Sequence, residues 1–173
     1  RPPSAGPCPA VDAVGAMAKR HSIRARDIEA RTKTVYPAEF AHVTNGRAKR
    51  ALGNAFGLDQ FGVNLTDLAP GAASALKHWH TQEDELVYVL SGEVVLLIGD
   101  DEEILTAGDC IGFKAGAATG HAIINRSGET ATILEVGSRR MDIDEGHYPD
   151  VDLHVIPDGK GGRRFVRKDG SEV

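Results

Sequence analysis

Beyond residue 60 the chain falls into short runs in which apolar residues alternate with polar or small ones. Phe61, Val63 and Leu65 belong to the first such run, and the turn dipeptide Pro70-Gly71 follows it. Alternation with a period of two puts every second side chain on the same face, which is typical of a strand with one buried face. We therefore predict strands at about residues 61–66, 74–80, 85–90, 93–98, 103–106, 110–114, 121–126 and 130–136.

Turn residues separate these strands, and no run with helical periodicity lies between them. The 20 Gly residues of the chain favour many tight turns over long helices. Successive strands joined by short turns pair antiparallel, because a parallel pair needs a long crossover connection. The pattern predicts an all-β protein, an antiparallel β-sandwich or barrel.

The N-terminal segments are less regular. Residues 1–16 are rich in Pro, Ala and Gly and too poor in apolar residues for a signal peptide. We interpret them as a non-core extension, native or introduced by cloning. Residues 17–57 form an expected N-terminal arm, with an edge strand at 34–36, where Pro37 interrupts further pairing, and a loop over 45–57.

The barrel is predicted to span residues 58–137, and the regular pattern fades after Gly137. Residues 138–173 contain an acidic stretch, a Gly-rich stretch and one apolar pair, Phe165-Val166, that predicts a last short strand. This segment has too few apolar residues to fold alone. We expect a C-terminal arm that packs on the barrel or on a partner chain.

Charge and composition exclude some classes of function. The 173 residues correspond to about one domain, and the net charge of -5 gives no electrostatic attraction to nucleic acid. No apolar run approaches the length of a membrane span. The chain has two cysteines, Cys8 and Cys110, in unrelated contexts, so a disulfide framework is not supported and a cytoplasmic location is expected.

Candidate chemistry is concentrated around two histidines. On a strand, His78 and His80 point to the same face while Trp79 points to the other. Imidazole and carboxylate together suit a divalent transition metal ion. Three acids follow, and Glu85 begins the strand whose Val87 and Val89 share its face. Glu83 and Asp84 precede that strand and are expected in a solvated turn, with Glu83 as a candidate second partner or base.

A further histidine, His121, shares its strand face with Ile123 and Asn125, which makes a second strand with a candidate ligand near its start. Three imidazoles and a carboxylate facing inward are costly to bury unless something binds them. The spacing of all four residues indicates a metal site.

These two blocks resemble the two signature motifs of the cupin superfamily, Gly-x5-His-x-His-x3-4-Glu-x6-Gly and Gly-x5-Pro-x-Gly-x2-His-x3-Asn. The first block reads Gly71-x6-His78-x-His80-x4-Glu85-x6-Gly92. The second reads Gly108-x5-Lys114-Ala115-Gly116-x4-His121-x3-Asn125. This chain departs from the pattern by one extra residue before His78, by Lys114 in place of Pro, and by a longer loop before His121.

The resemblance implies a jelly-roll barrel in which His78, His80, Glu85 and His121 bind one divalent metal ion per chain, Mn, Fe, Ni, Co or Zn. The whole chain resembles a bacterial single-domain cupin 2 subgroup described as sugar-phosphate-isomerase-like. Cupins commonly dimerise by exchanging terminal strands, so the resemblance also implies a homodimer.

Three functions are compatible with such a site. The first is a metal-dependent isomerase or lyase acting on a small oxygen-chelating substrate, such as a sugar, a sugar phosphate or a carboxylate. The second is an Fe(II)-dependent dioxygenase, and the third is a non-catalytic cupin that binds a small ligand. Candidate catalytic residues are Glu83 and Lys114, and candidate substrate-binding residues are Asn64, Lys114 and Asn125.

Phosphate recognition requires a cation near the metal. By strand parity Lys77 and Arg126 face away from the ligand side, which leaves Lys114 as the candidate and weakens the sugar-phosphate interpretation.

Overall fold

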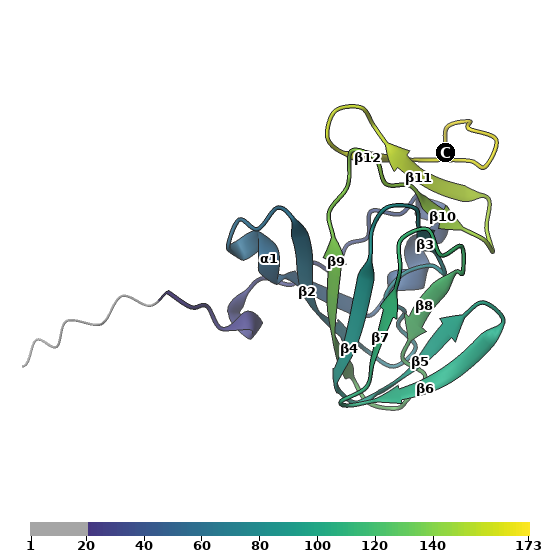
Figure 1. Cartoon of the computed structure of the whole chain (residues 1–173). Coiled ribbons are helices and arrows are strands. Elements are labelled where there is room, and N and C mark those ends of the chain that lie inside the picture. The colour runs from purple at the N-terminus through teal and green to yellow at the C-terminus, as the bar shows by residue number, and fades with distance from the viewer. Residues whose placement is uncertain (1–20) are drawn as a thin grey trace, which may run out of the picture.

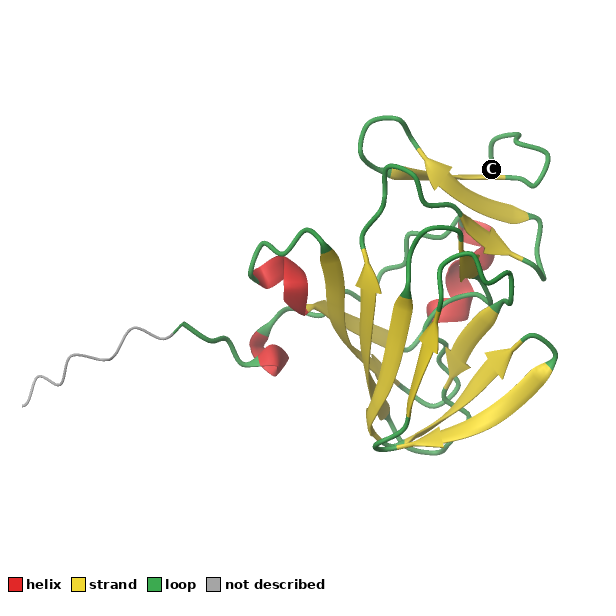
Figure 2. Ribbon diagram, viewed as in Figure 1, coloured by secondary structure: helices red, strands yellow, loops and turns green. Residues whose placement is uncertain are grey.

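The computed structural model describes residues 21–173, and the predicted extension over 1–16 and Cys8 lie outside this part of the chain. Helical structure within it is limited to η1 (Ala25–Asp27), η2 (Ala38–Thr44) and α1 (Leu52–Ala55). The strands are β1 (Arg47–Ala51), β2 (Phe61–Leu68), β3 (Trp79–His80), β4 (Glu85–Ser91), β5 (Glu93–Ile98), β6 (Asp101–Thr106), β7 (Cys110–Phe113), β8 (His121–Ile124), β9 (Ala131–Ser138), β10 (Gly146–Tyr148), β11 (Leu153–Pro157) and β12 (Arg163–Val166). The prediction of an all-β fold is confirmed (Figure 2).

The strands form three antiparallel sheets. A five-stranded sheet has the order β1-β2-β9-β4-β7, and a three-stranded sheet has the order β6-β5-β8. These two sheets face each other as a sandwich, and a four-stranded sheet, β12-β11-β10-β3, lies across one end of it (Figure 1). The predicted antiparallel fold of the jelly-roll sandwich type is confirmed, and its sheets do not join into a closed barrel among the described strands.

One end of the sandwich, which we call the apolar end, is filled by aliphatic side chains from both sheets. Leu68, Val89 and Ile133 come from the five-stranded sheet and Leu96 and Ile123 from the three-stranded sheet, and each is at most 2% exposed. On β4 the alternation is clear, since Val87 and Val89 are buried while Leu86, Tyr88 and Leu90 are exposed. This end is the main hydrophobic core.

The turn between β4 and β5 closes against this core through Gly92. Its φ of 80° lies in the left-handed region, which side chains other than hydrogen disfavour. A Cβ atom at this position would lie 2.8 Å from the Cα of Ala131. The glycine of the first motif is therefore needed both for its backbone conformation and for the close approach of β9.

The N-terminal arm contributes a strand that the sequence did not predict. Residues 45–57 were expected to be a loop, but β1 pairs with β2 along its whole length, so that prediction is wrong. The strand was missed because its inward residues, Arg47 and Lys49, are charged. The expected edge strand at 34–36 is also wrong: these residues are irregular, and Tyr36 packs in a second core instead.

The second core lies beneath the C-terminal sheet. Tyr148, Leu153 and Val155 are its buried members, and Tyr36 and Phe165 pack against them. The last predicted strand, at Phe165-Val166, is confirmed as part of β12, whereas β10 and β11 were not predicted. These two strands are short, and their apolar residues alternate over too few positions for the sequence pattern to distinguish a strand from a loop.

The first described residues are attached to the outer surface of the five-stranded sheet. Arg26 pairs with Asp67 at 2.7 Å and donates to the Thr132 hydroxyl at 3.2 Å, and Arg50 also pairs with Asp67 at 2.7 Å. The Asp67 carboxylate on β2 thus connects Arg26 of the N-terminal arm with Arg50 of β1 and Thr132 of β9. No helix in residues 21–173 has the length and apolar character of a membrane span.

Candidate metal centre

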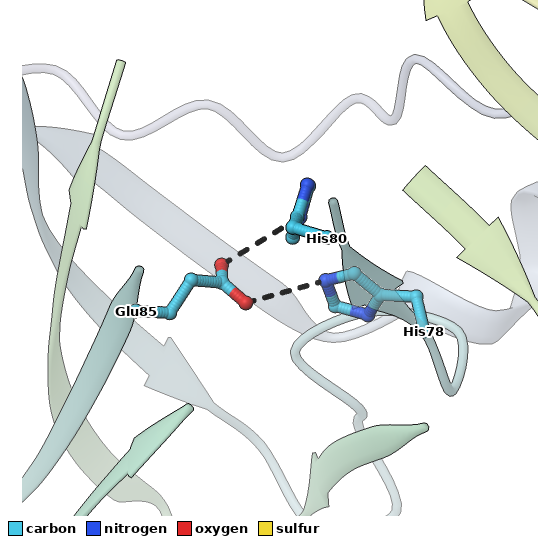
Figure 3. Close-up of side chains that lie close together, drawn as sticks. All are labelled: His78, His80 and Glu85. Carbon is cyan, nitrogen blue, oxygen red and sulfur yellow. Dashed lines mark ion pairs between the residues drawn. The ribbon is translucent and has the colours of Figure 1, made fainter. Parts of the chain in front are cut away.

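Three of the predicted ligands converge where the sandwich meets the C-terminal sheet. His78 Nε2 lies 3.8 Å from Glu85 Oε2, and His80 Nε2 lies 3.9 Å from Glu85 Oε1 (Figure 3). The ligand atoms of these three residues all lie within 4.8 Å of one another. The strand argument for Glu85 holds, since Val87 and Val89, on the same face of β4, are 8% and 0% exposed.

The other ring nitrogen of each histidine is already bound. His78 Nδ1 lies 2.7 Å from the Leu76 carbonyl oxygen, and His80 Nδ1 lies 2.6 Å from Asp144 Oδ2. When Nδ1 donates its proton to such an oxygen, Nε2 carries the lone pair that a metal ion requires. Both Nε2 atoms face Glu85, so the tautomers and the ring orientations suit metal binding.

The fourth predicted ligand, His121, reaches the group through Glu85. Its Nε2 lies 2.9 Å from Glu85 Oε2, and its ring stacks on Phe113 at a centroid distance of 3.5 Å. It does not belong to the set of three whose ligand atoms lie within 4.8 Å. Its Nδ1 is buried and has no hydrogen-bond partner among the described residues.

The ionisation of the group also suits a cation. Burial lowers the pKa of His78 to about 4, which keeps the ring neutral near pH 7. Burial opposes the ionisation of Glu85, but the His121 hydrogen bond and the histidine charges outweigh it and lower its pKa to about 2. For His80, burial is outweighed by the Asp144 hydrogen bond and nearby carboxylates, so its pKa is raised. A carboxylate flanked by imidazole nitrogens is a donor set that divalent transition metals accept, so these residues fit such an ion.

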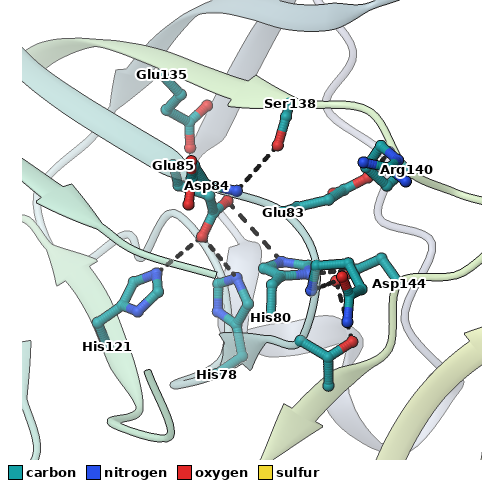
Figure 4. A network of polar contacts seen from close by, with 12 residues as sticks. His78, His80, Glu83, Asp84, Glu85, His121, Glu135, Ser138, Arg140 and Asp144 are labelled. Atoms are coloured by element: carbon teal, nitrogen blue, oxygen red, sulfur yellow. Dashed lines mark hydrogen bonds and ion pairs between the residues drawn. The ribbon is translucent and has the colours of Figure 1, made fainter. Parts of the chain in front are cut away.

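A second carboxylate group supports His80 from behind. Asp144 is fully buried, accepts the backbone N–H of Gln82 at 2.8 Å and pairs with Arg163 at 3.0 Å (Figure 4). Arg163 also pairs with Glu83 at 2.7 Å. His80, Glu83 and Asp144 form a second group with closely spaced donor atoms, but Arg163 already forms an ion pair with each of its two acids. This group therefore positions His80.

The backbone also approaches His80 closely. Gly146 of β10 pairs directly with His80 of β3. A Cβ atom at Gly146 would lie 3.6 Å from His80 Cε1 and 2.6 Å from Val155 Cγ1. Any larger residue at this position would displace β11 or the ligand ring.

His78, Glu85 and His121 line a cavity of about 310 Å³, and His78 and His80 line an adjoining cavity of about 500 Å³. The two cavities share Lys49, Ser74, Ala75, His78, Met141 and Arg163. We call the space that they form together the ionic end of the sandwich, because charged side chains gather around it. The four predicted ligands thus all lie at the ionic end.

The structure separates the candidate substrate and catalytic residues. Glu83 and Asn64 line the first cavity. Lys114 is exposed and lines neither cavity. Asn125 is fully buried and lines neither; its amide donates to the carbonyl oxygens of Leu68 and Glu129, each at 2.7 Å. The last residue of the second motif therefore holds the turn after β8.

The two other cations considered for phosphate lie elsewhere, as their parity predicted. Lys77 donates to the Gly99 carbonyl oxygen, and Arg126 pairs with Glu102 on the surface at 2.6 Å.

Several charged residues that line the cavities were not predicted from the sequence: Arg31, Arg47, Lys49, Glu135, Arg139 and Arg163. Glu135 could have been found, because it shares its face of β9 with the buried Ile133. Arg47 and Lys49 could have been found from their i, i+2 spacing.

Comparisons with known proteins agree with this geometry. The family model described as Cupin domain matches residues 64–137. A sugar phosphate isomerase of the cupin superfamily from Silicibacter pomeroyi is 41% identical, with a TM-score of 0.82 over 88% of this chain and 96% of that chain. A proposed sugar phosphate isomerase from Acidithiobacillus ferrooxidans is 34% identical, with a TM-score of 0.66 over 73% of this chain and 80% of that chain.

More distant structures share the fold. A polyketide cyclase from Streptomyces resistomycificus is 23% identical, with a TM-score of 0.56 over 70% of this chain and 80% of that chain. No curated protein sequence matches the chain significantly.

Proposed function

The chain belongs to the cupin superfamily, and from that premise we propose that it is a metal-dependent isomerase acting on a phosphorylated sugar. Its proposed ligands are His78, His80, Glu85 and His121. The observation that carries the proposal is the convergence of the His78 and His80 Nε2 atoms on the Glu85 carboxylate, at 3.8 and 3.9 Å, beside the two adjoining cavities. The two sugar phosphate isomerase structures, similar over most of their length, support the choice of substrate.

A divalent ion bound by these residues would polarise the carbonyl group of an α-hydroxy carbonyl substrate. Isomerisation then needs a carboxylate to move a proton between the two neighbouring carbon atoms. Glu83 and Glu135 line the cavity and lie outside the ligand set.

The two carboxylates differ in how freely they can accept that proton. Glu135 uses Oε2 for both the Thr66 hydroxyl, at 2.6 Å, and the Lys49 ammonium, at 2.9 Å. Glu83 uses Oε1 for both the Arg140 N–H, at 2.6 Å, and Arg163, at 2.7 Å. The Glu135 side chain is 18% exposed and that of Glu83 is 10% exposed, which favours Glu135 for the proton transfer.

The test begins with metal content. We expect purified protein to carry about one equivalent of a divalent transition metal by elemental mass spectrometry. His80→Ala should lose this metal while keeping its β-sheet circular dichroism spectrum, and His42→Ala, an exposed histidine in η2, should keep the metal. Stoichiometric metal in His80→Ala would contradict the ligand set.

The reaction is tested without oxygen. Metal-loaded protein is incubated in deuterated water with a panel of aldose and ketose phosphates, and NMR follows loss of the C–H signals next to the carbonyl. Deuterium incorporation that disappears in Glu135→Gln supports the proposal. In a separate aerobic assay, oxygen consumption with Fe(II) would favour the dioxygenase alternative. Ligand binding by metal-free protein without turnover would favour the non-catalytic alternative.

The homodimer and the cytoplasmic location also remain proposals. The outward face of the five-stranded sheet supports self-association: Leu86 and Tyr88 of β4 are 42% and 38% exposed beside Val136 and Leu134 of β9. Size-exclusion chromatography with light scattering measures the oligomeric state.

The proposed cytoplasmic location is supported by the small number of cysteines in the sequence.

A further inference from the structure

A row of cationic side chains faces the ionic end from the edge of the five-stranded sheet. Lys49 of β1 lies directly opposite Thr66 of β2, and Thr66 lies opposite the buried Ile133 of β9. Residues directly opposite each other in antiparallel strands share a face, so Lys49 points inward. Arg47, two residues earlier, points the same way.

Arg31 extends this row by one more position. An isolated bridge joins its backbone to that of Lys49, with N–H···O distances of 2.9 and 3.0 Å in the two directions. Its side chain therefore lies on the face of Lys49, and it lines the first cavity. Three cations from the N-terminal arm thus stand side by side on one wall.

Two of these cations have no carboxylate partner. Among residues 21–173, neither Arg31 nor Arg47 forms an ion pair within 4.0 Å, whereas Lys49 pairs with Glu135 at 2.9 Å. Arg47 is half-buried; it donates one N–H to the Ser74 carbonyl oxygen, and its Nε is buried without a partner. Burial lowers the pKa of Arg47, which is the penalty expected for a cation that lacks a counter-ion. An anion on this wall would remove that penalty.

The charge of the whole space favours an anion as well. The side chains that line the two cavities include five Lys or Arg and three Glu: Arg31, Arg47, Lys49, Arg139, Arg163, Glu83, Glu85 and Glu135. A divalent ion at the ligand group would add to this excess of positive charge. Because Arg47 shares its cavity with His78 and His80, one small molecule can contact both the cationic wall and the ligand group.

We propose that Arg31, Arg47 and Lys49 form an anion-binding subsite that holds the phosphate group of the substrate while its sugar oxygens face the ligand group. The proposal rests on the proposed function, because it takes the substrate of that site to be phosphorylated. Two guanidinium groups and an ammonium group match a phosphate ester, whose three terminal oxygens accept several charge-assisted hydrogen bonds. The subsite also supplies the cation near the ligands that Lys77, Lys114 and Arg126 do not provide.

The test measures binding of inorganic phosphate to metal-loaded protein by isothermal titration calorimetry. We expect Arg31→Gln and Arg47→Gln each to weaken phosphate binding about tenfold or more, since each removes a charge-assisted contact. Metal content should stay the same, because neither residue is a proposed ligand. Arg126→Gln is the matched control, as its side chain lies on the surface against Glu102, and it should bind phosphate like the unmodified protein.

Each outcome decides between the subsite and its alternatives. Unchanged phosphate affinity in Arg31→Gln overturns the subsite. Because Arg31 is exposed, this variant should fold and provides the test even if Arg47→Gln does not fold. Tighter binding of acetate than of phosphate overturns the phosphate assignment. If the unmodified protein contains no metal, the proposed function is overturned. If that metal-free protein still binds phosphate and Arg31→Gln weakens the binding, the anion-binding subsite stands by itself.

Discussion

Leu68, Leu96 and Ile133 fill one end of the sandwich, whereas His78 and Glu85 stand at the other end among cations. The same strands reach both ends. The paired strands β2 and β9 place Leu68 and Ala131 at the apolar end, and Gly62 and Gly137 line a cavity at the ionic end. The difference therefore lies in what covers each end. Strands of the sandwich close the apolar end by themselves, while the two arms complete the ionic end.

The two ends of the sandwich contribute differently to folding stability and to binding. The apolar end excludes water through closely packed aliphatic side chains. The ionic end keeps its charges through pairs that cross between segments, such as Asp144 with Arg163 and Lys49 with Glu135. We expect substitutions at the apolar end to change the free energy of unfolding, and substitutions at the ionic end to change what the protein binds.

The largest effect is expected from Leu96→Ala. Leu96 is 1% exposed in the main core, and removal of its side chain leaves a cavity that costs about 2–5 kcal/mol of unfolding free energy. Urea denaturation followed by circular dichroism measures the loss. Ile104→Ala on the neighbouring strand is the control, because Ile104 is 62% exposed and should cost little. Equal losses in the two variants would break the comparison by showing that the apolar end does not carry the stability.

A smaller effect, on binding, is expected from Asp144→Asn. Loss of this carboxylate removes the partner that orients His80, and such changes typically weaken metal affinity about 10–100-fold. Competition with a chelating dye measures the affinity. Asp142→Asn, an exposed acid on the same segment, should leave it unchanged. If Asp144→Asn instead unfolded the protein as readily as Leu96→Ala, the proposed separation between the two ends would be wrong.

The smallest effect is expected from Asp67→Asn, on the outer surface and away from both ends. Burial opposes ionisation of Asp67, but its bonds to Thr132, Arg26 and Arg50 outweigh it and lower its pKa below 3.8. A carboxylate with a lowered pKa contributes stability above its unfolded pKa, and this is lost as the pH falls through the folded value. The variant should cost about 1 kcal/mol at pH 7, and less below about pH 4.

Denaturation at both pH values measures this effect, with the exposed Asp59→Asn as the control. Metal content should not change. A cost that is the same at pH 7 and at pH 3 would show that Asp67 contributes through its shape and not through its charge.

The same comparison explains what could be predicted from the sequence. Strands β4, β5 and β7 were predicted to within one residue at each end. The burial of β4 and β7 alternates along the strand, and β5 is an apolar run between turns at Gly92 and Gly99. Alternation did not reveal which face is inward: Phe61 is 42% exposed on the outer face of β2, while its polar neighbours Asn64 and Thr66 face the interior. Patterns of apolar residues predict the apolar end well.

The ionic end was only partly predictable. The histidine and glutamate spacing predicted that His78, His80 and Glu85 form one group, and the structure places their potential ligand atoms within 4.8 Å of one another. Asp144 and Arg163 contact the site from residues more than 60 positions beyond His80, through strands with few apolar residues. Charged side chains that face inward contradict the pattern from which strands are recognised, so Arg47 and Lys49 were assigned to a loop.

The two-residue strand β3 joins the two cores. His78 forms an isolated bridge with His121 of the sandwich, while Trp79 and His80 pair with β10 of the C-terminal sheet. An ion shared by His80 and Glu85 would act as a cross-link between two cooperative folding units, much as a disulfide does. Its binding energy would then set how often the C-terminal sheet opens, so the amide hydrogens of β10 and β11 would exchange with solvent more slowly as the free metal concentration rises.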